Sequence, residues 1–376
     1  MSTSEHRGAR LHRLLLLSHS DVASLLQSHG LGKLVDDLVL RLEHEFAQAA
    51  EPGRVTVPPR DGVANERGRH PSLVEWMPSD RVEGDTCLKI VGYHPENPRR
   101  FGLPTILATI SLIDGETGAV KAIVDGTILT CLRTAASSVV ASRLLANPAS
   151  SVLGLIGCGA QAVAHVHALV RFFPLQRVLI CDVNPETQRS FASRLRDVSR
   201  DLEIVPASAD EVRAQSDILC TATTTRPGDP PVFSDGECQP HLHVNAVGSD
   251  FPGKLEVPRS LLERALVIPD FAEQAFKEGE CQQMSREETG PELCKLSADP
   301  EAWRGYRDRL TVFDSTGWAL EDQVIAEQFY ALANKAGAGH WVTMEDLGAD
   351  PLDPFEFLAT PERAPNHPIP GLGSTA

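Results

Sequence analysis

The stretch Val152-Leu153-Gly154-Leu155-Ile156-Gly157-Cys158-Gly159-Ala160-Gln161-Ala162 decides the fold of this chain. Its first five residues form an apolar run typical of a buried strand, and the run leads directly into a G-x-G-x-x-A pattern. In such a pattern Gly157 makes the tight turn after the strand, Gly159 lets a pyrophosphate approach the backbone, and Ala162 lets the next helix pack closely. Unpaired N–H groups at the start of that helix attract anions. The stretch therefore predicts a dinucleotide site.

A second apolar run, Arg177 to Cys181, ends at Asp182. A carboxylate at this place accepts hydrogen bonds from the hydroxyls of a ribose and repels a 2′-phosphate, which favours NAD(H) over NADP(H). The alternative is that Asp182 only begins the turn that runs to Pro185.

Apolar runs and helical patterns alternate after Pro148, with runs at 152–156, 177–181, 204–205, 218–221, 243–247 and 265–268 and helices expected at 162–173 and 186–198. This alternation predicts an α/β fold with a Rossmann-type doubly wound parallel sheet. The first half carries an expected strand at 11–17, two helices separated at Gly30 and Gly32, a turn-rich span at 52–66, and strands at 73–77, 87–91, 105–112 and 120–124. That pattern predicts a strand-rich α/β half-domain, to which a helix at 320–333 is expected to return.

Composition narrows the function. The 376 residues are enough for two hydrophobic cores, and 35 Lys and Arg against 51 Asp and Glu give a net charge of −16. Such a surface repels phosphate backbones and anionic lipid, so neither nucleic acid nor a membrane is expected as a partner. The eight cysteines include no C-x-x-C pair, which predicts reduced thiols, no metal site and a cytoplasmic protein. The first ten residues and the stretch from Thr360 read as tails.

Three cations in the first half are candidates for holding a small anionic group: Arg60, Lys89 and Arg133. Arg133 stands out because it lies among small residues, in Leu132-Arg133-Thr134-Ala135-Ala136-Ser137-Ser138, at the start of an expected helix. Such a place brings backbone and guanidinium close to a ligand, and a guanidinium binds a carboxylate through two parallel hydrogen bonds.

Four motifs in this order resemble the ornithine cyclodeaminase/mu-crystallin family: RTAA at 133–136, GCGAQA at 157–162, VNAVGSD with PGKLE at 244–256, and VFDSTG at 312–317. The resemblance covers the chain from Leu14 to Phe357. Asp250 before Pro252-Gly253-Lys254 and Glu75 before Met77-Pro78 resemble the cyclodeaminase branch of the family. The stretches 58–60, 93–105 and 350–354 are most similar to lysine cyclodeaminases, and the core motifs fit ornithine cyclodeaminases nearly as well.

The resemblance implies an NAD-dependent cyclodeaminase whose substrate is a small basic amino acid. Such an enzyme converts L-lysine to L-pipecolate and ammonia by transient hydride transfer to bound NAD and ring closure by the distal amine. The corresponding conversion of L-ornithine to L-proline is an alternative. Two other readings stay open, an NAD(P)H-dependent imine reductase or amino-acid dehydrogenase of the same family and a non-catalytic ligand-binding protein.

The resemblance also implies roles for individual residues. Asp250 would move the proton near Cα, Arg60, Lys89 and Arg133 would hold the α-carboxylate, Glu75 would pair with the distal ammonium, and Thr316 would border the substrate. The implied cofactor contacts are Thr105, Gly157, Gly159, Ala160, Gln161, Asp182, Thr223, Val244, Asn245, Ala246, Val247, Lys254 and Ser315. A hydroxyl after a strand, as in Thr223 and Ser315, is also a common helix cap.

A homodimer formed through the strand-rich half is implied as well. We expect residues 1–143 with 318–376 to form a substrate-binding and dimerisation domain and residues 144–317 to form the NAD-binding domain. Pairing is physically sensible because short strands leave open sheet edges in a monomer.

Overall fold

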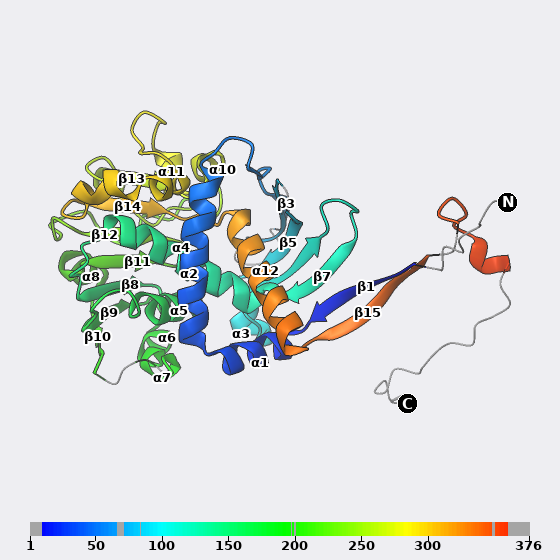
Figure 1. Ribbon diagram of the computed structural model, residues 1–376. Helices are drawn as coiled ribbons and strands as arrows, with labels where there is room; N and C mark the ends of the chain where they lie inside the picture. Colours follow the sequence, from blue (N-terminus) through cyan, green and yellow to red (C-terminus); the bar gives the residue numbers. More distant parts are fainter. Residues whose placement is uncertain are drawn as a thin grey trace.

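The computed structural model describes residues 10–65, 71–82, 84–196, 198, 201–347 and 350–359. The two tails expected from the sequence lie outside these residues, except for Arg10. Two separate sheets organise the chain, one in each half of the view in Figure 1.

The first sheet has eight strands in the order β15-β1-β7-β6-β5-β4-β2, with β3 paired to β4. Strand β1 runs parallel to β7, and the other neighbours are antiparallel. The strands are β1 (Arg10–Leu17), β2 (Val55–Thr56), β3 (Asp61–Asn65), β4 (Ser72–Arg81), β5 (Thr86–Tyr93), β6 (Ile106–Ile113), β7 (Val120–Asp125) and β15 (His340–Leu347).

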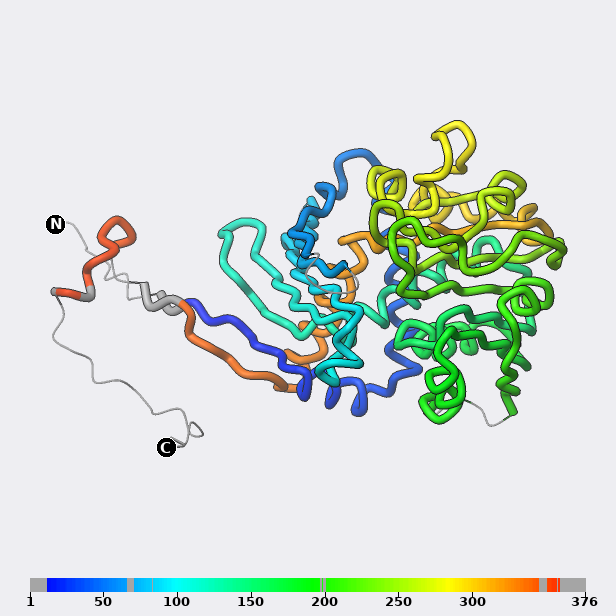
Figure 2. The backbone as a smooth tube through the Cα atoms, turned by 180° about the vertical axis from the view of Figure 1, so that it is seen from behind, coloured from blue at the N-terminus to red at the C-terminus, as the bar shows by residue number. Residues whose placement is uncertain are grey.

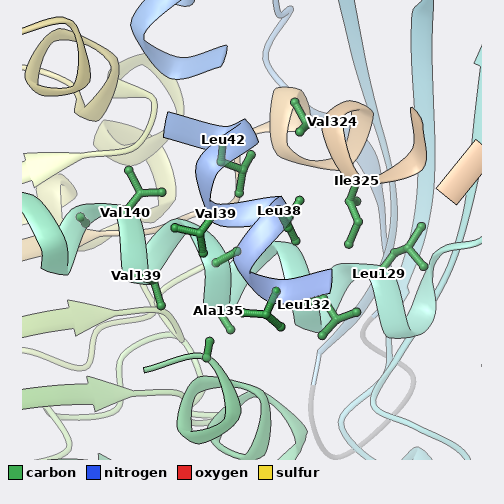
Figure 3. Packing of buried hydrophobic residues seen from close by; sticks show 14 of the residues in the cluster. Leu38, Val39, Leu42, Leu129, Leu132, Ala135, Val139, Val140, Val324 and Ile325 are labelled. Atoms are coloured by element: carbon green, nitrogen blue, oxygen red, sulfur yellow. The ribbon is translucent and has the colours of Figure 1, made fainter. Parts of the chain in front are cut away.

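One face of this sheet is covered by helices. They are α1 (His19–His29), α2 (Leu31–Ala49), α4 (Gly126–Leu145) and α12 (Ala319–Ala336), while the short α3 (Asn97–Phe101) links β5 to β6. The apolar side chains between α2, α4 and α12 form the centre of the main core (Figure 3), and they include Leu38, Val39, Leu42, Leu129, Leu132, Ala135, Val139, Val140, Val324 and Ile325. Helix α4 is long and apolar enough to span a membrane, but most of it is buried in this core.

The other face of the first sheet is open. Val74, Trp76, Ile90 and Leu107 point to this side and are between 39% and 46% exposed. Strands β1 and β15 continue beyond the sheet as a two-stranded ribbon that projects from the body (Figures 1 and 2).

The second sheet has seven strands, all parallel, in the order β10-β9-β8-β11-β12-β14-β13. They are β8 (Val152–Ile156), β9 (Arg177–Cys181), β10 (Glu203–Pro206), β11 (Ile218–Thr221), β12 (His243–Ala246), β13 (Leu266–Pro269) and β14 (Thr311–Asp314). The strand order reverses between β8 and β11, which is the place where doubly wound sheets bind ligands.

Helices cover both faces of the second sheet, so the predicted doubly wound α/β fold is confirmed. The α-helices are α5 (Ala160–Leu169), α6 (Pro185–Arg189), α7 (Phe191–Arg194), α8 (Ala209–Gln215), α9 (Arg259–Leu262), α10 (Ala272–Glu278) and α11 (Leu293–Ala298). Short 3-10 turns occur at η1 (Glu280–Gln283), η2 (Pro300–Tyr306) and η3 (Glu356–Ala359).

The sequence-based boundaries were wrong at several places. The helix expected at 162–173 is α5 and ends at Leu169. The helix expected at 186–198 is split at Ser190, where the bend lets the Phe191 ring enter the core. Helices α1 and α2 separate at Gly30, whose φ is +86°, while Gly32 lies inside α2. The turn-rich span at 52–66 contains strands β2 and β3, which extend the first sheet.

Candidate active site

The turn after β8 has the shape that a dinucleotide pyrophosphate needs. Gly157 has a φ of +94°, and a Cβ there would lie 2.4 Å from the carbonyl oxygen of Ala222, so the position admits only glycine. A Cβ on Gly159 would meet nothing within 4 Å, so the backbone beside it is open. Helix α5 begins at Ala160 without a side-chain cap, which leaves its first N–H groups free to bind an anion.

Asp182 holds this turn from the end of β9. Its Oδ2 accepts a hydrogen bond from the Cys158 N–H at 2.8 Å, and its Oδ1 accepts one from the Asn184 N–H at 2.7 Å. The Arg194 Nη1 donates to the Cys158 carbonyl at 2.7 Å. The carboxylate therefore lies beside the glycine turn, where it can also receive the hydroxyls of a ribose.

Glu256 ties together the loops that follow β11 and β12. Its buried carboxylate accepts hydrogen bonds from the Thr221 hydroxyl, from the Thr223 N–H and hydroxyl, and from the Gly248 N–H, at 2.6 to 2.8 Å. A Cβ on Gly248 would lie 2.2 Å from the Glu256 Oε1, so glycine is required there. The Thr223 hydroxyl donates its hydrogen to Glu256, so its oxygen can still accept a hydrogen bond from a cofactor.

The remaining expected cofactor residues differ in their placement. Ser315 Oγ and Gln161 Oε1 are buried and find no hydrogen-bond partner among the described residues, as expected of groups that await a ligand. Val244 and Ala246 are fully buried in the core, and the Asn245 Nδ2 donates to Ser142 on α4 at 3.1 Å.

Two further expected contacts lie at the edges of this region. Val247 follows β12 and is 8% exposed. Thr105 directly precedes β6, and its backbone carbonyl accepts a hydrogen bond from the His94 N–H. With the open glycine turn and Asp182, the residues present fit an NAD molecule at the carboxyl ends of β8, β9 and β12.

Lys89 on β5 and Arg133 on α4 meet two acids in the first turn of α12. The Lys89 Nζ lies 2.6 Å from Asp322 Oδ2, and the Arg133 Nε donates to Asp322 Oδ1 at 3.0 Å. The Arg133 Nη1 donates to Glu321 Oε2 at 2.8 Å. All four groups are almost completely buried. Burial, together with Arg133, lowers the pKa of Lys89 to about 8, and burial raises the pKa of Glu321 to about 7.

Gly317 lets the Arg133 guanidinium approach the loop after β14. Its φ is +92°, and a Cβ would lie 2.8 Å from the Arg133 Nη1. The Gly317 N–H donates to Asp270 Oδ2 at 2.6 Å, and the Thr316 hydroxyl donates to Asp270 Oδ1 at 2.9 Å. Burial raises the pKa of Asp270 to about 7. Thr316 thus lies beside Arg133, in a backbone conformation that Asp270 fixes.

Arg60 is surrounded by three acidic residues from both parts of the molecule. Its Nε donates to Glu278 Oε1 at the end of α10 and lies 3.5 Å from Glu75 Oε1 on β4. Its Nη2 donates to the Asp250 backbone carbonyl at 3.1 Å. Burial raises the pKa of Glu75 to about 7 although Arg60 opposes the rise. Three acidic residues surround one guanidinium, so this region has an excess of acidic groups and suits an added ammonium group.

Asp250 lies in the turn that follows β12. Its side chain is 31% exposed, and its Oδ1 accepts a hydrogen bond from the Lys254 Nζ at 2.7 Å. Lys254 itself is only 2% exposed. A narrow cleft between the two parts of the molecule opens beside this turn, lined by Leu73, Tyr93 and Pro95 on one side and by Thr225, Phe251 and Lys254 on the other. The Asp250 carboxylate is therefore partly exposed, next to this narrow cleft.

The structure brings Arg60, Glu75 and Asp250 together in one region and Lys89, Arg133 and Thr316 in a second. Lys89 and Arg60 are near enough to influence each other's charge, so the two regions adjoin. Among the described residues, no group of three or more His, Cys, Asp and Glu side chains has the arrangement of a metal site. All eight cysteines are free thiols.

Four functional residues were not identified from the sequence. Three are the acids that pair with the predicted cations, namely Glu278, Glu321 and Asp322, and the fourth is Glu256, which joins the loops after β11 and β12. One signal for Glu321 and Asp322 was available, since two adjacent acids follow closely after the motif that ends at Gly317, at the start of an expected helix. Fully buried acids need a cationic partner, and Lys89 and Arg133 are the two most buried of the three candidate cations.

Comparison with known proteins gives consistent matches over nearly the whole chain. A family model described as the ornithine cyclodeaminase/mu-crystallin family matches residues 20–337. The L-lysine cyclodeaminase of Streptomyces rapamycinicus is 39% identical over 91% of this chain and 99% of its own length. The ornithine cyclodeaminase of Agrobacterium fabrum is 30% identical, over 93% of this chain and 95% of its own.

Solved structures give the same picture. A lysine cyclodeaminase, whose structure was described for recognition of L-lysine, L-ornithine and L-2,4-diaminobutyric acid, has a TM-score of 0.88 and 44% identity and covers 92% of this chain and 99% of its own. A dimeric archaeal alanine dehydrogenase with bound NAD has a TM-score of 0.79 and 31% identity and covers 89% of this chain and 100% of its own.

Proposed function

This chain belongs to the ornithine cyclodeaminase/mu-crystallin family, and from that membership we propose that it is an NAD-dependent cyclodeaminase that converts L-lysine to L-pipecolate and ammonia. The observation that carries the proposal is the meeting of Glu75 and Asp250, from different parts of the fold, on one buried guanidinium, that of Arg60. The lysine cyclodeaminase relative and the lysine cyclodeaminase structure support the same reading.

NAD is the cofactor of this family fold, and when bound it supplies a reversible hydride acceptor, so that the reaction has no net redox change. The N–H groups at the start of α5 would hold its pyrophosphate beside Gly157 and Gly159, and Asp182 would accept the ribose hydroxyls. Further contacts would come from Thr105, Ala160, Gln161, Thr223, Ser315 and Val247, whereas Val244, Asn245 and Ala246 are fully buried in β12.

Charge divides the substrate site into two ends. Glu75, which is largely buried, would pair with the distal ammonium, since an unpaired ammonium in such a place is costly. Arg60, Lys89 and Arg133 would hold the α-carboxylate. Asp322 and Glu321 lie against Lys89 and Arg133, so the substrate carboxylate would bind to cations that already carry counter-charges in the fold.

Asp250 would take and return the proton near Cα. Its carboxylate is partly exposed, while its backbone carbonyl is fixed by Arg60 and its side chain by Lys254. A general acid–base needs this combination of access and fixed geometry.

The preference for lysine over ornithine is part of the proposal. The two substrates differ by one methylene, which changes binding by only ~1–3 kcal/mol in an apolar pocket. Ornithine is the second candidate because an ornithine cyclodeaminase is 30% identical. A side-by-side measurement of kcat/KM decides between them, and an excess for ornithine would reverse the assignment.

A dehydrogenase reading is tested by stoichiometry. With L-lysine and a trace of NAD⁺, a cyclodeaminase releases ammonia and ring product in excess of the NAD⁺ supplied and accumulates no NADH. Ammonia limited to the amount of NAD⁺ supplied, with that NAD⁺ converted to NADH, would instead indicate the chemistry of the alanine dehydrogenase relative. Lack of any turnover would favour a ligand-binding protein.

We further propose that the chain forms a homodimer through the open face of the first sheet. Its exposed Val74, Trp76, Ile90 and Leu107 are typical of a surface that another chain covers. The first sheet with its helices would then form the substrate-binding and dimerisation domain, and the second sheet the NAD-binding domain.

A further inference from the structure

We propose that Lys254 serves the reaction by positioning the Asp250 carboxylate, and that Tyr93 in turn holds Lys254. The inference rests on the proposed function, because it assigns the surroundings of the proposed acid–base. It differs from the sequence-based expectation, in which Lys254 is a cofactor contact.

The Lys254 ammonium is directed at Asp250. Its Nζ donates to Asp250 Oδ1 at 2.7 Å, and the lysine is 2% exposed whereas the aspartate is 31% exposed. Burial, the largest single effect, lowers the pKa of Lys254, but Asp250, Tyr93 and Glu256 together outweigh it, so the pKa of Lys254 is raised. The ion pair therefore joins a fixed, charged interior group to a carboxylate at the cleft.

The backbone of Lys254 is fixed as firmly as its side chain. Its N–H donates to the Phe251 carbonyl at 3.0 Å, and its carbonyl accepts hydrogen bonds from the Ser249 hydroxyl and from the Gln282 Nε2. The Gly253 N–H also donates to the Gln282 Oε1. These hydrogen bonds thus fix the turn that carries Asp250, and the Lys254 side chain lies on the buried side of that turn.

Tyr93 covers Lys254 from the first sheet. The Lys254 Nζ lies over the Tyr93 ring, 5.1 Å from its centre, which is within the range of a cation–π contact. Burial, the larger effect, and the Asp250 charge raise the pKa of Tyr93 to about 12, so it is a neutral phenol at ordinary pH. Tyr93 and Lys254 therefore meet at the cleft between the two parts of the molecule, and Lys254 extends this contact to Asp250.

An exposed pair provides a matched control. Lys33 and Asp37 have the same spacing of four residues and are also in contact, but their side chains are 61% and 40% exposed. Exposed pairs of this kind contribute little to stability, whereas a buried ammonium that loses its partner is strongly unfavourable.

The kinetic test compares Lys254→Met, Lys254→Arg and Tyr93→Phe with the wild type. We expect Lys254→Met to lower kcat by about a hundredfold, within the usual contribution of an acid–base, while the Kd for NAD⁺ stays within about twofold. Lys254→Arg should recover part of kcat because it keeps the charge, and Tyr93→Phe should keep most of kcat because it keeps the ring that covers the lysine. A Kd for NAD⁺ raised by about tenfold or more, with kcat unchanged at saturating NAD⁺, would overturn the inference.

A stability measurement tests the pair without any turnover. In a double-mutant cycle, Asp250→Asn should lower the Tm, and adding Lys254→Met to it should recover part of the loss because the unpaired ammonium is gone. The same cycle on Lys33 and Asp37 should be additive within error. Additivity at Asp250 and Lys254 would refute the pair, whereas coupling there in a protein that turns over no diamino acid would leave the pair intact and refute the proposed function.

Discussion

Replacing Gly159 and Gly157 separately by alanine tests the cofactor site with a matched pair of variants. The two glycines stand two residues apart in the same turn, but their surroundings differ. A Cβ on Gly159 has nothing within 4 Å, and its φ of −80° suits alanine. A Cβ on Gly157 would lie 2.4 Å from the Ala222 carbonyl oxygen at a φ of +94°.

The expected magnitudes follow from these contacts. Gly159→Ala should cost the apoprotein at most about 1 kcal/mol of unfolding free energy, because alanine is a poorer residue than glycine at a helix N-cap. Gly157→Ala should cost about 2–6 kcal/mol, since a strained φ and a backbone overlap each cost about 1–3 kcal/mol. Against a total of about 5–15 kcal/mol, this is a large fraction of the stability.

For NAD⁺ binding we expect a large loss in Gly159→Ala. The methyl group would push the pyrophosphate from the α5 N–H groups, and each hydrogen bond to a charged group contributes about 1.5–3 kcal/mol. Loss of one such bond raises Kd by about ten- to hundredfold. Titration calorimetry with NAD⁺ and thermal unfolding of the apoproteins measure the two effects. Wild-type affinity in a stably folded Gly159→Ala would refute a dinucleotide at this turn.

Three further outcomes are expected. Asp182→Ala should weaken NAD⁺ binding by about tenfold or more and narrow the preference over NADP⁺, as titration with both cofactors would reveal; an unchanged preference would remove Asp182 from the ribose site. The pKa of Glu75 is raised to about 7, so this carboxyl is neutral below that pH and ionised above it, and kcat/KM for lysine should rise with pH through about 7. The Glu75→Gln variant should lose this rise in kcat/KM. A rise that persists in the variant belongs to another group. Trp76→Glu with Ile90→Glu should convert a dimer to a monomer in sedimentation velocity, because the changes place charges on the open face of the first sheet; a dimer that persists is held elsewhere.

Local patterns predicted most of the second sheet. The motif at Gly157 and Gly159 and the acid at Asp182 are both adjacent to the strands that carry them, so a short window of sequence contains the geometry. The Glu186–Val198 helix was the exception, since the apolar side chain of Phe191 fits a helical period yet enters the core only when the backbone bends at Ser190.

The surroundings of the predicted cations could not be read in this way. Arg60 meets Glu278, which is 218 residues away, and Arg133 meets Asp322, which is 189 residues away. A sequence can indicate that a buried charge needs a partner, but the partner is chosen by tertiary packing. For this reason the sequence presented these cations as free anchors, whereas in the fold each already carries a counter-charge.

The most direct test of cyclodeamination uses L-lysine labelled with deuterium at C2 and NAD⁺ at about one-hundredth of the substrate. Since the proposed reaction would return the Cα hydride to the same carbon, we expect pipecolate that retains the deuterium, in an amount far above the NAD⁺ supplied. Mass spectrometry of the product measures both quantities. Product limited to the amount of NAD⁺, or pipecolate that has lost its label, would contradict cyclodeamination.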